Sequence, residues 1–357
     1  MSYTEIDDPT AYFQSNLHTG NSGTNAITFS GNSDLQPDWI WIKERGATGF
    51  HVLTDTVRGI TKQIYSNDTQ TENTNSSSVT AIGSNGFTLG NRADVNNNSD
   101  TYVSWNWKAG TSVSGDTTGS GTAKTYTGSV NTDAGFSIIK YTGNGTSGHT
   151  IPHNLTQKPA MIIVKNLTGD NWTVYHHKIA SDPATDYIFF NSTAAASDHV
   201  GYWNDTEPTS SVFTVGNDGG TNANNVSLIA YCFAEKQGYS KFGSYTGNGS
   251  TDGTFVYTGF KPAWFMIKRT NANSYWTIFD NKRSSSGGSN EIDYSLDANV
   301  SNAEETGTSV NDVDFLSNGI KIREDNGDLN SSGSTIIYMA FAENPFVTST
   351  GVPATAR

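Results

Sequence analysis

The sequence predicts an all-β protein made of three tandem β-sandwich, jelly-roll-like domains that arise from internal repeats. Three observations predict it: one series of motifs occurs three times, the apolar stretches are short, and helical periodicity is absent. Each copy begins with a Thr-Gly-Asn turn, at Thr19, Thr142 and Thr246, and a proline follows 16 to 18 residues after the threonine. The proline opens an apolar stretch that ends in lysine, and the three stretches read PDWIWIK (37–43), PAMIIVK (159–165) and PAWFMIK (262–268).

The copies continue with the same elements in the same order. An aromatic residue seven or eight positions after the lysine opens a second apolar stretch, at Phe50, Trp172 and Trp276. A hairpin segment and a last aromatic strand follow, and the last strands read YVSWNWK (102–108), LIAYCFA (228–234) and IIYMAFA (336–342). Units of about 100 residues have the usual size of a domain, so each copy is expected to fold around its own core.

Local patterns favour strands and hairpins. Stretches such as 136–141 and 212–215 are rich in β-branched and aromatic residues and are bounded by Gly, Asn or Ser. Asn-Gly pairs, as at Asn85 and Asn318, supply the positive φ of tight hairpin turns. No window of 11 or more residues combines helical spacing of apolar residues with end caps.

The strand between proline and lysine is apolar on both faces. Side chains alternate along a strand, so Trp39 and Trp41 share one face while Ile40 and Ile42 share the other. Such a strand must be covered twice, either as a central strand between two layers of one domain or as a seam to a neighbouring domain or subunit. The residues that would form this seam are Trp39, Trp41, Met161, Ile163, Trp264 and Met266. We interpret the terminal lysines, Lys43, Lys165 and Lys268, as solvated or snorkelling side chains.

The repeats divide the chain into segments. We expect an N-terminal arm (1–12), β-sandwich repeats at 13–109, 125–237 and 238–347, and a C-terminal tail (348–357). Residues 110–124 are rich in Gly, Ser and Thr and predict a flexible linker. Because only 235–238 separates the second and third repeats, these two should form one rigid arm, with the first repeat more loosely hinged.

Charge and cysteine content restrict the partners and the compartment. The net charge of −13 disfavours nucleic acid and anionic membranes as partners. The N-terminal residues lack the pattern of a signal peptide, no stretch is apolar enough to span a membrane, and one cysteine cannot form an intramolecular disulfide. A repeated, Asn- and Thr-rich β composition is typical of extracellular proteins. A virion protein, made in the host cytoplasm and released by lysis, satisfies both sets of facts.

Residues that could carry chemistry were compared with their counterparts in the other repeats. Cys232 is a possible nucleophile, but its counterparts are Asn106 and Ala340, which favours a small buried side chain. A metal could use His149, His153, His176 and His177, although strand-edge polar histidines explain them as well. The acidic segment 324–328 lacks the full alternating pattern of a calcium loop and favours a turn. We therefore predict no enzymatic activity, no metal and no cofactor.

Several of these segments resemble a known family. The stretches 7–14, 33–43, 151–166, 208–216, 241–269 and 337–346 are similar to marine tailed-phage structural proteins that carry tandem copies of an uncharacterised domain, distantly similar to SPRY and concanavalin-like sandwiches. The resemblance covers nearly the whole chain and implies a virion protein of the tail or its fibres. It brings no catalytic residues.

The expected function is therefore that of a virion structural protein with a role in host adsorption. The alternatives are a capsid decoration protein and a free carbohydrate-binding module or adhesin. The expected partners are other virion proteins, a host surface glycan or protein, and further copies of the chain, because a symmetric oligomer would cover the doubly apolar strands. For host contact the loop of Tyr202, Trp203, Asn204 and Asp205 offers a ring that could stack on a sugar and polar groups for its hydroxyls, unless Trp203 packs into its own sandwich.

Overall fold

The computed structural model of the protein describes residues 4–285, 290–307 and 311–354, and over these residues the fold is all-β, as the sequence predicts. Its helices are single short turns, and none of those described is long and apolar enough to cross a membrane. They are η1 (Pro9–Ala11), α1 (Ala93–Asn96), α2 (Val200–Trp203), α3 (Gly219–Asn222) and α4 (Gly327–Asn330).

The first repeat folds into two packed sheets. Its strands are β1 (Phe13–Thr19), β2 (Asn25–Thr28), β3 (Trp39–Glu44), β4 (His51–Asp55), β5 (Lys62–Tyr65), β6 (Asn73–Thr74), β7 (Val79–Gly83), β8 (Gly86–Leu89) and β9 (Thr101–Trp107). A large sheet has the order β1-β9-β3-β4-β5-β6, and a small sheet has the order β2-β8-β7. All pairings are antiparallel.

The second repeat has a similar plan, but it begins with three strands that have no counterpart in the first repeat, and it lacks a counterpart of β7. Its strands are β10 (Thr111–Asp116), β11 (Thr118–Gly119), β12 (Thr125–Asn131), β13 (Phe136–Thr142), β14 (His149–Pro152), β15 (Met161–Asn166), β16 (Trp172–His176), β17 (Asp186–Phe189), β18 (Ser197–Asp198), β19 (Val212–Val215) and β20 (Ser227–Phe233). The large sheet has the order β10-β12-β13-β20-β15-β16-β17-β18, and the small sheet has the order β11-β14-β19.

The third repeat closes the series. Its strands are β21 (Ser240–Thr246), β22 (Phe255–Tyr257), β23 (Phe260–Arg269), β24 (Thr277–Asp280), β25 (Glu291–Ile292), β26 (Tyr294–Asp297), β27 (Glu305–Thr306), β28 (Val313–Leu316), β29 (Gly319–Ile322) and β30 (Thr335–Pro345). The large sheet has the order β21-β30-β23-β24-β26-β27, and the small sheet has the order β22-β29-β28-β25.

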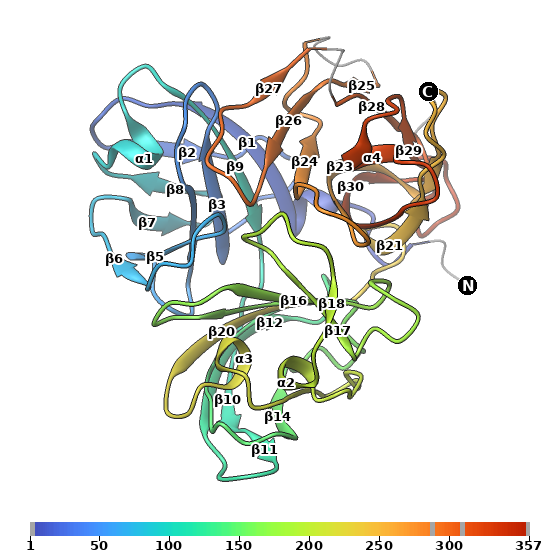
Figure 1. Ribbon diagram of the computed structural model, residues 1–357. Helices are drawn as coiled ribbons and strands as arrows, with labels where there is room; N and C mark the ends of the chain where they lie inside the picture. The colour runs from blue at the N-terminus through green and yellow to red at the C-terminus, as the bar shows by residue number, and fades with distance from the viewer. Residues whose placement is uncertain (1–3, 286–289, 308–310, 355–357) are drawn as a thin grey trace.

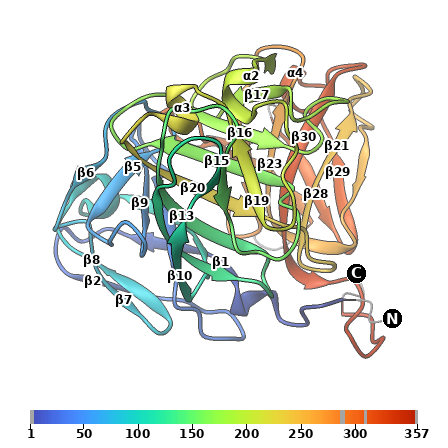
Figure 2. The same cartoon turned by 90° about the horizontal axis from the view of Figure 1, so that it is seen from below.

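Each repeat is thus a sandwich with its own core, and the three sandwiches surround a fourth, shared core. The three units lie around a common centre in Figure 1, and Figure 2 shows them from below. In every repeat the proline-to-lysine strand lies in the large sheet between the last strand of the repeat and the strand that comes next in the sequence, as in β9-β3-β4. Its one face packs inside its own sandwich, and the other face packs in the shared core.

The predicted linker is wrong. Residues 110–124 contain β10, which pairs with β12, and β11, which pairs with β14. The composition predicted a linker and not a strand because β10 lies at the edge of its sheet and is largely exposed on both faces. It therefore carries no apolar stripe.

The described N-terminal residues are packed, whereas the described residues of the predicted tail are largely exposed. Thr4 and Ile6 of the predicted arm are buried, and Ile6 belongs to the shared core. The amide of Ser349 in the predicted tail donates to Asp7 at 2.7 Å, so the first and last described segments of the chain lie side by side. The predicted hinge at the first repeat is wrong as well, because that repeat shares its core with both others.

Candidate functional site

The shared core collects all six residues of the predicted seam. Trp39, Trp41, Met161, Ile163, Trp264 and Met266 are each at most 1% exposed and belong to one apolar cluster. The last strands add alternate residues to the same cluster: Val103, Trp105, Trp107, Ile229, Tyr231, Phe233, Ile337, Met339 and Phe341. The neighbour that covers these strands is therefore another repeat of the same chain.

Aromatic rings join the units pairwise within this core. Trp39 of the first repeat stacks on Tyr231 of the second with ring centroids 4.5 Å apart. Trp107 meets Trp264 of the third repeat edge to face at 5.7 Å, and Phe233 meets Phe341 at 6.2 Å. Each such pair contributes roughly 0.5–1.5 kcal/mol beyond the burial of its area.

Backbone hydrogen bonds link the units in a closed cycle. A loop of each repeat offers a carbonyl to the next: Thr69 accepts from Asp170 N at 3.1 Å, Thr193 from Ser274 N at 2.9 Å, and Ser301 from Gly49 N at 2.8 Å. Three residues further along, the amides of Glu72, Ala196 and Glu304 donate to the carbonyls of Leu167, Thr270 and Arg45. The first repeat thus contacts the second, the second the third, and the third the first.

Two of the three repeated lysines take part in this cycle. Lys43, Lys165 and Lys268 are fully buried, which contradicts the expectation of solvated side chains. Lys165 Nζ donates to Thr69 O at 3.0 Å, and Lys268 Nζ donates to Thr193 O at 2.9 Å, both across a junction between repeats. Lys43 instead donates to Glu44 O and Ala47 O in its own hairpin. Burial lowers the pKa of Lys43 and Lys165 to about 8 and that of Lys268 to about 7.

Buried ion pairs lie at two of the junctions. Arg283 donates to Asp280 at 2.6 Å and to Glu304 at 3.0 Å, and Asp280 also accepts from Trp105 Nε1 of the first repeat at 2.9 Å. The first repeat has the same arrangement, in which Arg58 pairs with Asp55, and Asp55 accepts from Tyr231 of the second repeat. The second repeat has His176 in the place of the aspartate, and its imidazole contacts Tyr338 O at 3.1 Å.

The predicted host-contact loop divides between interior and surface. Trp203 is 1% exposed and packs edge-on against Tyr175 at 5.9 Å, so its ring cannot stack on a sugar. Tyr202 is half-buried against Tyr187, Asn204 is half-buried as well, and only Asp205 is exposed. Asn204 and Asp205 both have left-handed backbone conformations. The aromatic part of the prediction is therefore wrong.

The residues examined for catalysis and metal binding occupy structural positions. Cys232 is buried on the inner face of its own sandwich, as predicted, and burial raises the pKa of its thiol. Three of the four histidines are fully buried, and all four contact backbone carbonyls. No group of three or more metal-ligating side chains occurs among the described residues. The acidic segment at Asn326 caps the short helix α4 through Asp328 N.

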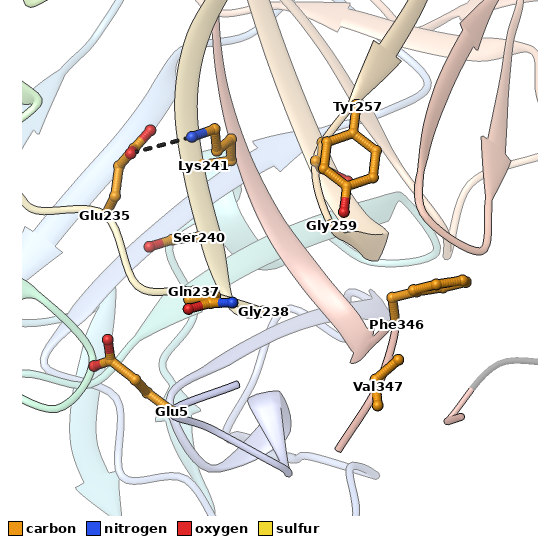
Figure 3. Close-up of a pocket in the computed structure, with 11 residues that line it drawn as sticks. Glu5, Glu235, Gln237, Gly238, Ser240, Lys241, Tyr257, Gly259, Phe346 and Val347 are labelled. Carbon is orange, nitrogen blue, oxygen red and sulfur yellow. Dashed lines mark hydrogen bonds and ion pairs between the residues drawn. The ribbon is translucent and has the colours of Figure 1, made fainter. Parts of the chain in front are cut away.

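A groove of about 470 Å³ is the best candidate for a binding site on the described surface. It lies where the third repeat meets the connection 235–238 and the N-terminal segment (Figure 3). Tyr257 of β22 and Phe346, just after β30, flank it on one side, and Glu5, Glu235, Gln237 and Lys241 supply polar groups on the other. Tyr257 is 61% exposed, the highest value among the described large apolar side chains.

The polar wall of the groove is held in place by its own hydrogen bonds. Glu235 accepts from the backbone N–H of Phe242 at 2.9 Å and from Lys241 Nζ at 3.2 Å. The N-terminal segment is fixed because Thr4 Oγ1 donates to Gln237 O at 2.9 Å. Gly238 has a φ of +79°, and a Cβ there would lie 2.2 Å from Thr4 Oγ1, so glycine is required for this packing.

Sequence reasoning missed this groove because its residues come from distant positions. Tyr257 and Phe346 are 89 positions apart in the sequence, and neither belongs to a sequence motif that would indicate a binding site. The available signal was the alternation in FVY (255–257), where Phe255 and Tyr257 are exposed on either side of buried Val256. An edge strand with outward aromatic side chains indicates a contact surface.

Comparison with known proteins gives one match. A family model described as "Domain of unknown function (DUF7483)" matches residues 8–345. No curated protein and no solved structure matches the chain. Because the family model covers most of the chain, from the first short helix to the end of the last strand, the protein belongs to the DUF7483 family of unknown function.

Proposed function

We propose that the protein is a non-catalytic structural component of a tailed-phage virion, in the tail or tail fibre, with a role in host adsorption. The observation that carries the proposal is the closed cycle of three repeats around one core, which makes the chain a stiff building block. The resemblance of several segments to tailed-phage structural proteins supports the same role. Such a block can contact other virion proteins through one face and a host surface through another.

Particles purified from infected cells would test this proposal. Mass spectrometry of the particles should detect the chain in a fixed ratio to the major structural proteins, and antibody labelling should place it on the tail. Labelling of the capsid shell would instead support the decoration role. Absence of the chain from purified particles would overturn the proposal.

The second candidate is a free carbohydrate-binding module or adhesin. The groove beside Tyr257 and Phe346 favours it, because an exposed ring beside fixed polar groups is suited to a small polar ligand. The two candidates differ in where the chain is found, in particles or free in the lysate. Light scattering on the isolated chain tests the predicted homo-oligomer. The doubly apolar strands no longer support that prediction, because other repeats of the same chain cover them.

A further inference from the structure

The groove at the junction of the third repeat with the N-terminal segment has the chemistry of a saccharide site. We propose that it binds a neutral oligosaccharide, with Tyr257 and Phe346 contacting the apolar faces of the sugar rings. The proposal rests on the proposed role in adsorption, for which it names the ligand class and the place of contact.

The aromatic side of the groove is exposed, and its backbone is held by hydrogen bonds. Tyr257 is 61% exposed and Phe346 is 37% exposed, although rings of this size are normally packed away from water. The turn that follows Tyr257 is fixed, because the amides of Thr258 and Gly259 both donate to Asn318 O, at 3.1 and 3.2 Å. Phe346 N in turn donates to Gly259 O at 3.3 Å. A backbone held in this way loses little freedom when a ligand contacts the side chains that it carries.

The opposite side of the groove can bind hydroxyl groups. The Glu235 carboxylate is oriented by Phe242 N and Lys241 Nζ, and the exposed Gln237 side chain lies nearby with both donor and acceptor atoms (Figure 3). Sugar hydroxyls both donate and accept hydrogen bonds, so a wall that combines carboxylate, ammonium and amide groups suits them. A volume of about 470 Å³ falls within the usual range of small-ligand sites, roughly 300–1,000 Å³.

Charge and area argue against other ligand classes. Two carboxylates, Glu5 and Glu235, line the groove of a chain with net charge −13, which disfavours nucleic acid and acidic glycans. A stable protein interface buries about 800 Å² on each partner around an apolar centre. The groove instead offers separate rings among polar groups, which suits a small polar ligand better.

Binding of the full-length chain to defined saccharides tests the proposal. The probes are neutral di- and trisaccharides of glucose, galactose, mannose and N-acetylglucosamine, with sialyllactose as an acidic probe, and the measurements are saturation-transfer NMR followed by calorimetric titration. We expect at least one neutral probe to bind. Tyr257→Ala and Phe346→Ala should each weaken that binding about tenfold or more, which corresponds to about 1.4 kcal/mol.

A matched control separates the groove from a general effect on the surface. Tyr275, 38% exposed, lies in the connection between β23 and β24, outside the groove. Tyr275→Ala should leave saccharide binding unchanged, and equal melting temperatures would show that all three variants fold. The proposal would be overturned if no neutral probe bound or if only the acidic probe bound. It would also be overturned if both groove variants bound the saccharide as tightly as the wild-type chain does. If the chain is found in virions but gives one of these results, the virion role stands and only the saccharide proposal fails. If the chain binds saccharide but is absent from virions, only the virion role is refuted.

Discussion

The buried lysines show how a single residue reports on the junctions between repeats. Lys268 is fully buried, and its ammonium group is held by the carbonyls of Thr193 and Ser274. Burial lowers the pKa of Lys268 from 10.5 to about 7, and this effect outweighs the nearby Asp328 carboxylate, which raises it. The native state therefore holds this proton less tightly than the unfolded chain does.

This difference predicts a pH dependence of stability. Below pH 7 both states carry the proton, and the cost of burying the charge is fully present. As the pH rises from about 7 toward 10.5, the native state gains stability by at most about 1.4 kcal/mol per pH unit. Lys268→Met removes this gain, so denaturant titrations should show wild type gaining on the variant across that range. The exposed Lys282, changed to Met, is the control, and parallel pH profiles for wild type and Lys268→Met would contradict the prediction.

Residue-scale features were predictable where they depend on side-chain alternation. The division of Trp39 and Trp41 from Ile40 and Ile42 follows from the period of two along a strand, and the two pairs do lie in different cores. The burial of Lys43 could not be predicted, because its acceptors are backbone carbonyls in a loop. Trp203 illustrates the same limit, since tertiary packing decides whether a loop tryptophan points inward.

Among the elements, the Thr-Gly-Asn turn has the clearest structural role. In each repeat its asparagine N–H donates to the side chain of the last residue of a short helix, at Asn96, Asn222 and Asn330. Asn222 Nδ2 also donates to Gly216 O at 2.6 Å, and the other two asparagines make equivalent bonds. The glycine of the turn passes so close that a Cβ on Gly143 would lie 2.4 Å from Ala223 O.

We therefore expect Asn222→Ala to destabilise the protein by about 2–4 kcal/mol, because it leaves several buried backbone groups without partners. Asn222→Asp keeps the acceptor for Asn144 N but loses the donors, so it should be destabilising as well. Chemical denaturation monitored by tryptophan fluorescence would measure both changes. The exposed Asn32, changed to Ala, should alter stability by less than about 0.5 kcal/mol, and a similar loss for Asn32→Ala and Asn222→Ala would contradict this account of the turn.

The sequence predicted these turns but not the helices that complete them. The repeated Thr-Gly-Asn motif was visible, whereas its partner asparagines lie about 75 to 82 positions away in helices of four residues, too short to show a period. The strand β10 was missed for a related reason, since an exposed edge strand of Ser, Thr and Gly has the composition of a linker. Elements are predictable when they bury an apolar face and are missed when they do not.

At the scale of the whole molecule, the three repeats form one body and not a chain of separate domains. The seam predicted from doubly apolar strands is present, but the closure of the third repeat onto the first carries no sequence signal, because it uses the carbonyl of Ser301, the amide of Gly49 and an ion pair between Arg45 and Glu304. Backbone groups are available at every position, so only the three-dimensional arrangement shows which of them pair.

A shared core predicts that the chain unfolds in one cooperative step. Separating any repeat would expose residues such as Trp41, Ile163 and Met266 to water, so no repeat is expected to melt alone. Scanning calorimetry should give equal calorimetric and van't Hoff enthalpies, whereas three independent domains would give a van't Hoff value of about a third. Ile163→Ala should destabilise this single transition by about 2–5 kcal/mol without splitting it. Phe315→Ala, in the separate core of the third repeat, is the matched change and should shift the same transition. A melting curve in which Ile163→Ala moves one of several peaks would show that the repeats fold independently.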